Sequence, residues 1–288
     1  MPRLSSRHSV NDRFAHTRCA CWADSGETLL QLNGSIDIGD WHANRDALEA
    51  CVVEFEIFDR FGSDRRFGLV LDPGEEVLFQ PEGGIVLADR TLTTLAAAVT
   101  EHGGKVLEET RVAAATEDGE GVRLELDSGS LQVKTAVVTA GSWAPRLVEL
   151  PEAVTTRETT AYFEYNEPIP SIIDSTLDGT THGYALQAPG VGTKAGLHKS
   201  GPAADPDGPA FPDYALADAA GEWLARRLPG FAANPIQVEA CMYTNLPDEQ
   251  FTLERRGRIV VGSACSGHGF KFAPAIGKRL AALALEAL

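Results

Sequence analysis

The segment SGHGFKF (residues 266–272) combines residue types that a ligand site uses. Its glycines let the backbone approach a ligand closely, and free amides at the start of a helix favour negative charge. His268 adds a titratable group and Lys271 adds a fixed cation. A tight turn between a strand and a helix explains the segment equally well, so both interpretations stay open at this point.

A second segment, TKAGLH (residues 193–198), places a cation and an imidazole on one side of an expected strand. Residues two and four apart in a strand share a face, so Lys194 and His198 project together with Gly196 between them. We expect this glycine to leave room for a flat ligand. An edge strand with ordinary polar residues facing solvent is the alternative interpretation.

Two further segments are less specific. In CMYT (residues 241–244), Cys241 and Tyr243 share a strand face and could form a reactive site, although buried cysteine is common and usually inert. In VVTAGSWAP (residues 137–145), a buried strand ends in a glycine turn, which is how many nucleotide-binding sheets place backbone against a cofactor. Ordinary packing explains this last segment equally well.

The elements in the first half of the chain favour a mixed sheet with helices on its faces. Apolar residues recur at helical spacing in residues 89–102, and Gly103-Gly104 is a typical end for such a helix. Short strands are expected at 27–38. The strands expected after the helix are 105–112, 122–126, 131–133 and 135–140, with a hairpin turn at 127–129.

The middle of the chain, residues 157–236, has a different pattern, and it predicts a second, antiparallel layer inserted into the first. Short β-type runs are followed by a helix at 215–228, which Pro229-Gly230 ends, and a Pro/Gly/Asp-rich loop at 201–212 precedes that helix. The strands expected in this layer are 159–165, 183–187 and 193–198. Beyond it we expect a buried strand at 258–263 and an amphipathic helix at 274–288.

Composition indicates a globular acidic protein. The chain has 288 residues, of which 43% are hydrophobic, and a formal net charge of −16. Such acidity repels phosphate backbones and disfavours nucleic-acid binding; it also fits a host with a salty interior. No apolar run approaches the roughly 18 residues of a membrane helix, and Met1 to Asn11 lacks the apolar stretch of a signal peptide.

The five cysteines indicate a reducing compartment. They are an odd number without the spacing of a disulfide framework, so we expect a cytoplasmic protein. Cys19 and Cys21 have no second close pair of metal-ligand type, and no metal is expected.

Together the segments resemble the flavoprotein family of monomeric sarcosine oxidase and N-methyltryptophan oxidase, within the wider D-amino-acid oxidase group. CMYT, followed by Asp248-Glu249 and then by SGHGFKF, is the most specific part. KAGLH at 194–198 and AGSW at 140–143 fall in the same order as in that family. The resemblance extends from Trp22 to the C-terminus.

The resemblance implies an FAD cofactor, joined covalently through the Cys241 thiolate to the 8α methyl group of the flavin. Lys194 would lie near flavin N5, the amides around Gly267 to Gly269 would face the N1/C2 side, and Val112 would lie against the adenine. The positions that would contact the cofactor are Val112, Ala140, Gly141, Trp143, Cys241, Gly267, Gly269 and Phe270.

The resemblance also implies an amine substrate and dioxygen as the second substrate. His198, Tyr243 and His268 would line the substrate cavity, and Lys271 would hold a substrate carboxylate. Lys194 would help the reduced flavin pass electrons to oxygen. The implied reaction oxidises a secondary or tertiary amine, or an N-methyl amino acid, to an imine with release of hydrogen peroxide, without metal or nicotinamide.

The implied fold is mixed α/β, with an antiparallel substrate-binding sheet interleaved with an incomplete Rossmann-like FAD-binding sheet. The FAD-binding domain would comprise residues 1–27, 77–150 and 245–288, and the substrate-binding domain residues 28–76 and 151–244.

The sequence departs from the family at its start. Family members open with a G-x-G-x-x-G turn for the dinucleotide, yet no such motif occurs ahead of Asp40. Arg7, Arg13 and Arg18 lie where the family has an arginine for the substrate carboxylate, but none aligns clearly. We therefore expect a truncated product, incomplete in its dinucleotide-binding domain, or a chain whose missing piece a partner supplies.

Three functions remain open at this stage. The first is the flavin amine oxidase. The second is a non-catalytic remnant or partner-dependent subunit, and the third is a flavin dehydrogenase that passes electrons to a carrier instead of oxygen.

Overall fold

A computed structural model describes residues 28–119, 121–177 and 181–286. Among these residues the chain divides into two compact units, each formed from separate stretches of sequence. The first unit comprises 30–86 and 156–242, and the second comprises 28–29, 87–155 and 243–286. Arg7, Arg13, Arg18, Cys19 and Cys21 lie outside the described residues, as does the N-terminal segment 1–27 of the expected FAD-binding domain.

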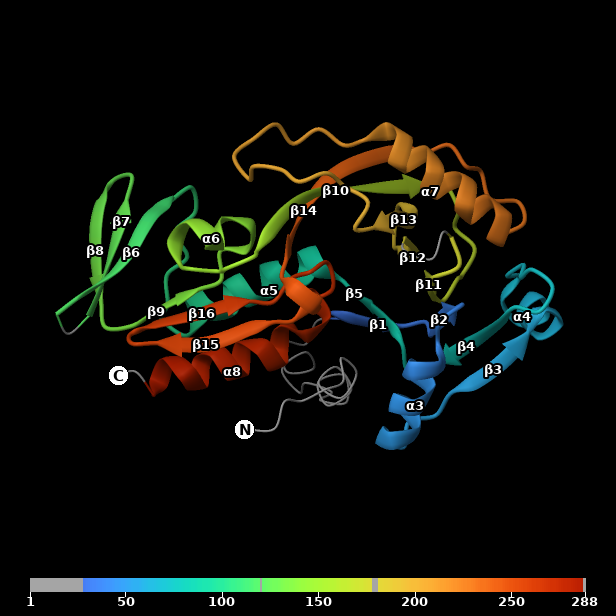
Figure 1. Cartoon of the computed structure of the whole chain (residues 1–288), viewed down its shortest axis with the longest axis horizontal. Helices are drawn as coiled ribbons and strands as arrows, with labels where there is room; N and C mark the ends of the chain where they lie inside the picture. The colour runs from blue at the N-terminus through green and yellow to red at the C-terminus, as the bar shows by residue number, and fades with distance from the viewer. Residues whose placement is uncertain (1–27, 120, 178–180, 287–288) are drawn as a thin grey trace. The chain divides into compact units, whose positions relative to one another are not determined.

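The first unit is built on an eight-stranded sheet in the order β14-β10-β13-β12-β11-β2-β4-β3 (Figure 1). Its neighbouring pairs from β10 to β3 are antiparallel, except β2 and β11, which run parallel. The strands are β2 (Ser35–Ile38), β3 (Glu56–Asp59), β4 (Glu76–Gln80), β10 (Val154–Phe163), β11 (Ser171–Asp174), β12 (His182–Ala188), β13 (Gly192–His198) and β14 (Gln237–Asn245).

One face of this sheet forms the main core against α7 (Tyr214–Arg227). Strand residues of one parity, such as Ala161, Phe163 and Ala195, are fully buried and pack in a cluster with Trp223 and Leu224 of the helix. The opposite parity therefore projects from the other face of the sheet. This division determines which side chains of β10, β12 and β13 are available for chemistry.

Smaller elements complete the first unit. Asp59 caps the short helix α4 (Arg60–Phe67) by accepting a hydrogen bond from the Gly62 amide at 2.8 Å. The remaining elements are α3 (His42–Cys51), β1 (Leu30–Leu32) and β5 (Gly84–Val86), with β1 and β5 paired in a two-stranded ladder.

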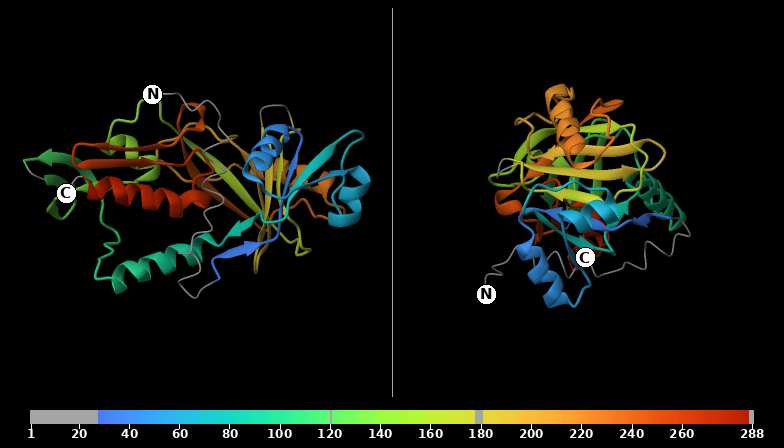
Figure 2. Two further views of the ribbon diagram at one scale, coloured as in Figure 1. Left: turned by 90° about the horizontal axis from the view of Figure 1, so that it is seen from below. Right: turned by 90° about the vertical axis from the view of Figure 1, so that its right-hand side faces the viewer.

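The second unit contains the mixed three-stranded sheet β15-β16-β9, in which β9 (Ala136–Val138) pairs parallel with β16 (Ile259–Ser263), and β15 (Thr252–Arg256) pairs antiparallel with β16. The final helix α8 (Ala273–Leu285) lies along β15 and β16 (Figure 1, Figure 2). Ile276, Leu280 and Leu283 of this helix are buried, as an amphipathic helix against a sheet requires.

The rest of the second unit is a β-hairpin layer and two helices. The strands are β6 (Val112–Asp118), β7 (Gly121–Leu126) and β8 (Gly129–Val133), and the helices are α5 (Ala88–Glu101) and α6 (Ala144–Leu147). Helix α5 has the expected apolar stripe, yet Leu92, Leu95 and Val99 on it are 56%, 51% and 44% exposed.

Most elements lie where the sequence indicates them. The helices expected at 89–102, 215–228 and 274–288, and the hairpin turning at 127–129, are confirmed within a few residues. The strand expected at 105–112 is wrong, because β6 starts only at Val112 and the preceding residues form a turn and irregular backbone. Among the described residues, no strand pairs with residues 105–107.

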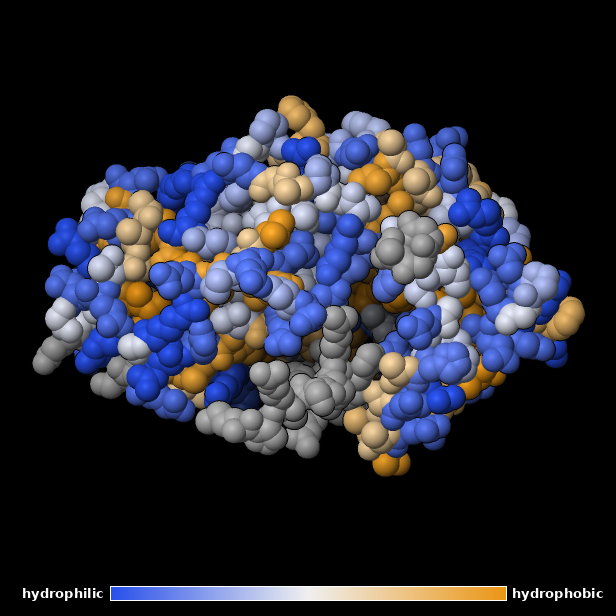
Figure 3. All heavy atoms as spheres, viewed as in Figure 1, coloured by the Kyte–Doolittle hydropathy of each residue, from blue (hydrophilic) through white to orange (hydrophobic). Residues whose placement is uncertain are grey.

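The division between the compact units falls later than the expected domain boundary. Residues 77–86 lie in the first unit because β4 pairs with β2 and β3, and β5 pairs with β1. Which unit binds FAD and which binds substrate stays a prediction. The face drawn in Figure 3 is mainly hydrophilic, in keeping with the net charge of −16.

Candidate functional site

The candidate residues of the first unit gather on the sheet face opposite α7. Lys194 and His198 of β13 are half-buried there, and their buried neighbours Ala195 and Leu197 face the core. Antiparallel pairing places Tyr162 of β10 opposite Lys194, and the Lys194 Nζ lies 5.8 Å from the centroid of the Tyr162 ring. The sequence prediction that Lys194 and His198 share a face is therefore borne out by the strand geometry.

Cys241 of β14 belongs to the same face. Its thiol lies 3.9 Å from the hydroxyl of Thr160, which β10 carries two residues before Tyr162. The side chain of Cys241 is exposed, unlike an inert cysteine in a core. We call this surface the lysine face; its residues are Thr160, Tyr162, Tyr184, Lys194, His198 and Cys241.

Tyr184 of β12 occupies the space above Gly196. The two residues are paired in the register of β12 with β13, and a Cβ added at Gly196 would lie 2.6 Å from the Tyr184 hydroxyl. That hydroxyl reaches across the glycine to the Thr160 hydroxyl at 3.2 Å. The expectation that Gly196 leaves room for a flat ligand is thus corrected: the room admits the phenol of Tyr184.

A second histidine, which the sequence patterns did not single out, lies beside His198. His182 of β12 is directly opposite His198 in the strand register, and the two rings are nearly parallel with centroids 6.4 Å apart. The sequence could have predicted this pairing, because the register of a hairpin between 183–187 and 193–198 determines which residues lie opposite each other. Identifying it required the correct register.

In the second unit, the SGHGFKF segment forms a tight turn into a helix. Ser266 is fully buried, and its amide donates to the Thr244 carbonyl at 3.0 Å while its hydroxyl accepts from the Leu246 amide at 3.3 Å. Gly267 has φ +77°, a left-handed conformation that glycine adopts without strain. The segment continues through a 3₁₀ turn at Phe270–Phe272 into α8.

The ring of His268 is held between two aromatic residues. Its centroid lies 5.2 Å from that of Phe251 in a stacked arrangement and 6.4 Å from that of Phe272, edge to face. The backbone amide of His268 donates to the Cys265 carbonyl at 3.0 Å, and its Nδ1 lies 3.0 Å from the Ser266 carbonyl. The Lys271 Nζ lies 5.3 Å from the Phe272 ring centroid.

The CMYT segment joins this turn through Thr244. The Thr244 amide donates to the Cys265 sulfur at 3.3 Å, and its hydroxyl lies 3.3 Å from that of Ser142. Ser142 belongs to the AGSW segment, a 3₁₀ turn at Gly141–Trp143. Two segments far apart in the sequence are therefore tied together by one buried hydroxyl pair, and Cys265 is a sulfur that the sequence patterns did not single out.

Two other predicted residues are placed as follows. Trp143 is 41% exposed and its amide donates to the Ala140 carbonyl at 3.0 Å. Val112 is the first residue of β6 and pairs with Leu126. Their expected contacts with FAD stay predictions.

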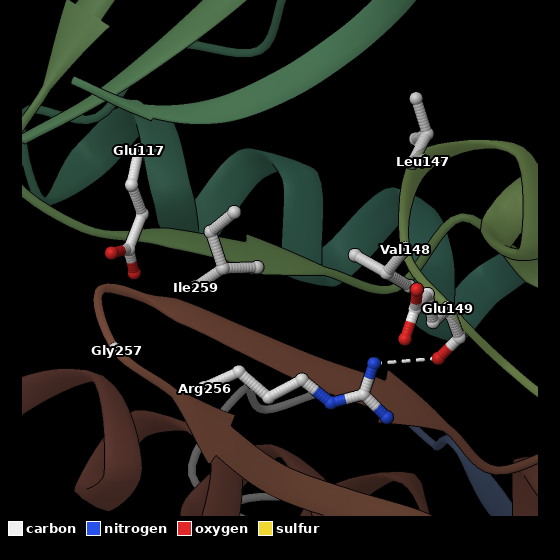
Figure 4. Close-up of a pocket in the computed structure, with 7 residues that line it drawn as sticks. All are labelled: Glu117, Leu147, Val148, Glu149, Arg256, Gly257 and Ile259. Atoms are coloured by element: carbon white, nitrogen blue, oxygen red, sulfur yellow. Dashed lines mark hydrogen bonds between the residues drawn. The ribbon is translucent and has the colours of Figure 1, made fainter.

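Two cavities among the described residues are lined by none of the predicted site residues. One, of about 410 Å³, lies in the second unit between Glu117, residues 147–149, Arg256, Gly257 and Ile259 (Figure 4). Arg256 at its edge is already engaged, because it donates to the Glu149 carbonyl at 2.6 Å and to the Glu254 carboxylate at 2.5 Å. The smaller, of about 230 Å³, lies beside Trp41, His42 and Glu75.

A cluster of ion pairs formed by Arg227, Asp174 and Glu75 lies on the core side of the sheet. Arg227 of α7 donates to Asp174 at 2.8 Å and to Glu75 at 2.6 Å, and the Trp223 indole donates to Asp174 at 2.9 Å. Burial raises the pKa of Asp174, but the hydrogen bonds from Thr176, Trp223 and Arg227 outweigh it and leave that pKa below its ordinary value.

The other two members of this cluster respond to the same contacts. The hydrogen bond from Arg227 lowers the pKa of Glu75 more than burial raises it. Burial lowers the pKa of Arg227, but the two carboxylates raise it by more than burial lowers it, so this pKa lies above its ordinary value. We interpret the cluster as structural.

Two other properties concern the described residues only. Within them, no three histidine, cysteine or acidic side chains converge as a metal site would require. None of their helices combines the length and apolarity needed to traverse a bilayer.

Comparisons with known proteins connect these features to a family. The chain matches the family described as FAD dependent oxidoreductase over residues 10–283. It is 31% identical to peroxisomal sarcosine oxidase of Homo sapiens over 91% of this chain and 71% of that protein. It is 28% identical to monomeric sarcosine oxidase of Bacillus sp. (strain NS-129) over 81% of this chain, and this match spans 64% of the length of the Bacillus protein.

Solved structures agree on the fold. The open form of NikD, an unusual amino acid oxidase essential for nikkomycin biosynthesis, superposes with a TM-score of 0.85 at 21% identity, over 100% of this chain and 82% of the NikD chain. On the family match and the identity to sarcosine oxidases, the chain belongs to the FAD dependent oxidoreductase family.

Proposed function

We propose that the chain is an FAD-dependent amine oxidase that converts a secondary or tertiary amine, or an N-methyl amino acid, to an imine with release of hydrogen peroxide. The observation that supports this most is the lysine face, where Lys194, His198 and an exposed Cys241 thiol project from one side of a rigid sheet. A site on strands holds its groups more precisely than a site on loops.

The residue types present fit the flavin ring. The first unit offers a cation and an exposed thiol on one sheet face, and the second unit, taken by itself, offers the glycine turn at Gly267; each is a kind of group that flavin sites use. Lys194, Cys241, Gly267, Gly269 and Phe270 are the residues we assign to it. The sequence offers no G-x-G-x-x-G turn ahead of Asp40 for the pyrophosphate.

FAD, when bound, would supply the acceptor for the hydride equivalent lost from the α or N-methyl carbon of the amine and the route by which those two electrons reach dioxygen. Lys194 contributes a fixed positive charge, which stabilises the negative charge that develops as oxygen is reduced. Lys271 holds the carboxylate of the substrate through a charge-assisted hydrogen bond. Tyr243, His198 and His268 are the residues that the family resemblance assigns to orienting the amine, and we keep that assignment as part of the proposal.

The covalent link through Cys241 belongs to the proposal. The exposure of the thiol supports it, because a covalent bond to the flavin requires a sulfur that the ring can reach, and the thiol lies 3.9 Å from the Thr160 hydroxyl. Small amines and oxygen are the proposed partners, and the odd number of cysteines supports a reducing, cytoplasmic compartment.

The test is oxidation of N-methyl amino acids by the purified chain supplied with FAD, with oxygen uptake and peroxide recorded together. We expect about one peroxide per oxygen consumed, and the Lys194→Met variant as a control should lose most of the rate. If the chain oxidises the amine with an artificial electron acceptor but forms no peroxide with oxygen, the chain is a dehydrogenase and the oxidase proposal is wrong.

A second candidate is a partner-dependent subunit that keeps the amine-binding face and receives dinucleotide contacts from another chain. The exposed apolar stripe of α5 favours it, since Leu92, Leu95 and Val99 are 56%, 51% and 44% exposed and such surfaces mark interaction sites. FAD binding by the isolated chain would exclude this candidate.

A further inference from the structure

A buried carboxylate lies at one end of the lysine face. Glu158 of β10 precedes Thr160 by two residues and therefore projects from the same face of the sheet. Unlike an ordinary glutamate on a sheet face, it is only 1% exposed. A carboxylate is rarely buried to this extent unless its oxygens are satisfied.

The partners of Glu158 are the backbone amides that follow His198. Its Oε2 accepts from the Ser200 amide at 3.1 Å and from the Gly201 amide at 3.0 Å. Its Oε1 accepts from the Thr156 hydroxyl at 2.5 Å. One side chain thus holds two consecutive amides at the point where the chain leaves β13.

The segment held in this way, residues 199–213, is tied to β10 at further points. The Arg157 amide donates to the Pro202 carbonyl at 2.9 Å, and the Arg157 guanidinium donates to the Pro209 carbonyl at 2.7 Å. At its far end the Asp213 amide donates to the Thr159 hydroxyl at 2.8 Å. Among these hydrogen bonds, those to the Glu158 carboxylate are the ones made close to His198 by a side chain of the lysine face.

We infer that Glu158 is a positioning residue for His198 and for the start of segment 199–213, and that it thereby determines how tightly the amine substrate binds. This inference rests on the proposed function. His198 ends β13, so the path of residues 199–201 constrains the position of its backbone, from which the ring projects beside that of His182. Removing the acceptor leaves two amides unpaired near a half-buried surface, and the segment relaxes away from β10.

The role requires acceptor oxygens and not a negative charge. A glutamine can accept from both amides through its carbonyl oxygen and donate its amide to the Thr156 hydroxyl. Methionine has a similar length and no comparable acceptor. The pair E158Q and E158M therefore separates the two properties, and Glu164→Gln, at an exposed glutamate just beyond β10, is a matched control for loss of charge.

The first measurement is hydrogen exchange of the Ser200 and Gly201 amides in the full chain, together with the His198 imidazole resonances by NMR. In E158M we expect exchange at least about tenfold faster and shifted His198 resonances. E158Q and E164Q should match the wild type. Unchanged exchange or an unchanged His198 signal in E158M overturns the inference, whether or not the chain oxidises amines.

The second measurement is steady-state kinetics of the FAD-loaded chain. We expect KM for an N-methyl amino acid to rise about tenfold or more in E158M, with kcat altered by less than about threefold, because binding and not chemistry is disturbed. If E158M instead lowers kcat and the free energy of unfolding while KM stays unchanged, Glu158 supports the fold and does not position the substrate site, and the inference is overturned. A wild type without oxidase activity would count against the proposed function, and the NMR result would then decide this inference alone.

Discussion

The hydroxyl of Tyr184 lies 2.6 Å from the position that a Cβ on residue 196 would occupy, so Tyr184 and Gly196 depend on each other. The phenol crosses β13 only because position 196 has no side chain, and it reaches Thr160 at 3.2 Å by this route. The lysine face is therefore shaped by a tyrosine that lies between Lys194 and His198.

Gly196→Ala tests this dependence. The added methyl group forces the Tyr184 ring to move, and overpacking of this kind costs about 1–3 kcal/mol of unfolding free energy. In the Tyr184→Ala background the same substitution should cost much less, which a double-mutant cycle in urea would measure. Equal costs in both backgrounds would show that the two residues do not interact.

Lys194→Met should impair the reaction with oxygen more than the reaction with amine. A positive charge removed from the place where negative charge develops costs about 10²–10³ in rate. Stopped-flow spectroscopy separates flavin reduction from re-oxidation, and we expect the loss in the second. Lys134→Gln, at an exposed lysine just after β8, is the control that should leave both rates near the wild-type values.

Lys271→Met should weaken binding of substrates that carry a carboxylate. A hydrogen bond to a charged group contributes about 1.5–3 kcal/mol, which corresponds to a rise in KM of roughly 10- to 150-fold. An amine of similar size without a carboxylate should show little change. Equal losses for both substrates would mean that Lys271 does not hold the carboxylate.

Much of this arrangement follows from sequence patterns, and the reasons differ by element. Alternation in 193–198 predicts that Lys194 and His198 share a face, since strand geometry has a period of two. Helix 215–228 is equally direct, because its apolar spacing and its Pro229-Gly230 end agree. The registers that bring Tyr184 over Gly196 and His182 opposite His198 depend on strand pairing, which a single sequence specifies weakly.

Burial of Glu158 is a second example of what the sequence does not reveal. A glutamate in a polar run such as RETT is usually solvated, and only tertiary contacts with residues 200–201 bury it. The strand expected at 105–112 fails for a related reason: a strand forms only where another strand pairs with it, and within the described part of the chain residues 105–111 have no such partner.

The Asp174–Arg227–Glu75 cluster gives a prediction on stability. Asp174→Asn leaves the Arg227 guanidinium buried with one partner fewer, and breaking a buried pair costs about 3–5 kcal/mol. Glu56→Gln, which breaks the exposed pair with Arg66 at 2.8 Å, should cost less than about 1 kcal/mol. Urea unfolding at neutral pH compares the two variants.

The same cluster predicts that the free energy of unfolding decreases as the pH is lowered. The pKa values of Asp174 and Glu75 lie below their ordinary values in the folded state, so the unfolded chain binds protons first as pH falls. Their contribution is complete above about pH 5, where both states are ionised, and is lost as pH falls through the lower folded values. D174N should show a shallower loss of stability on acidification; an unchanged slope would contradict the assignment.

The most direct test of the central claim is the absorption spectrum of the purified chain, taken before and after acid precipitation, beside that of Cys241→Ser. We predict a flavin band that stays with the precipitated wild type and moves to the supernatant in the variant, as a covalent bond to Cys241 requires. A chain that is colourless and remains colourless after addition of FAD would contradict the account.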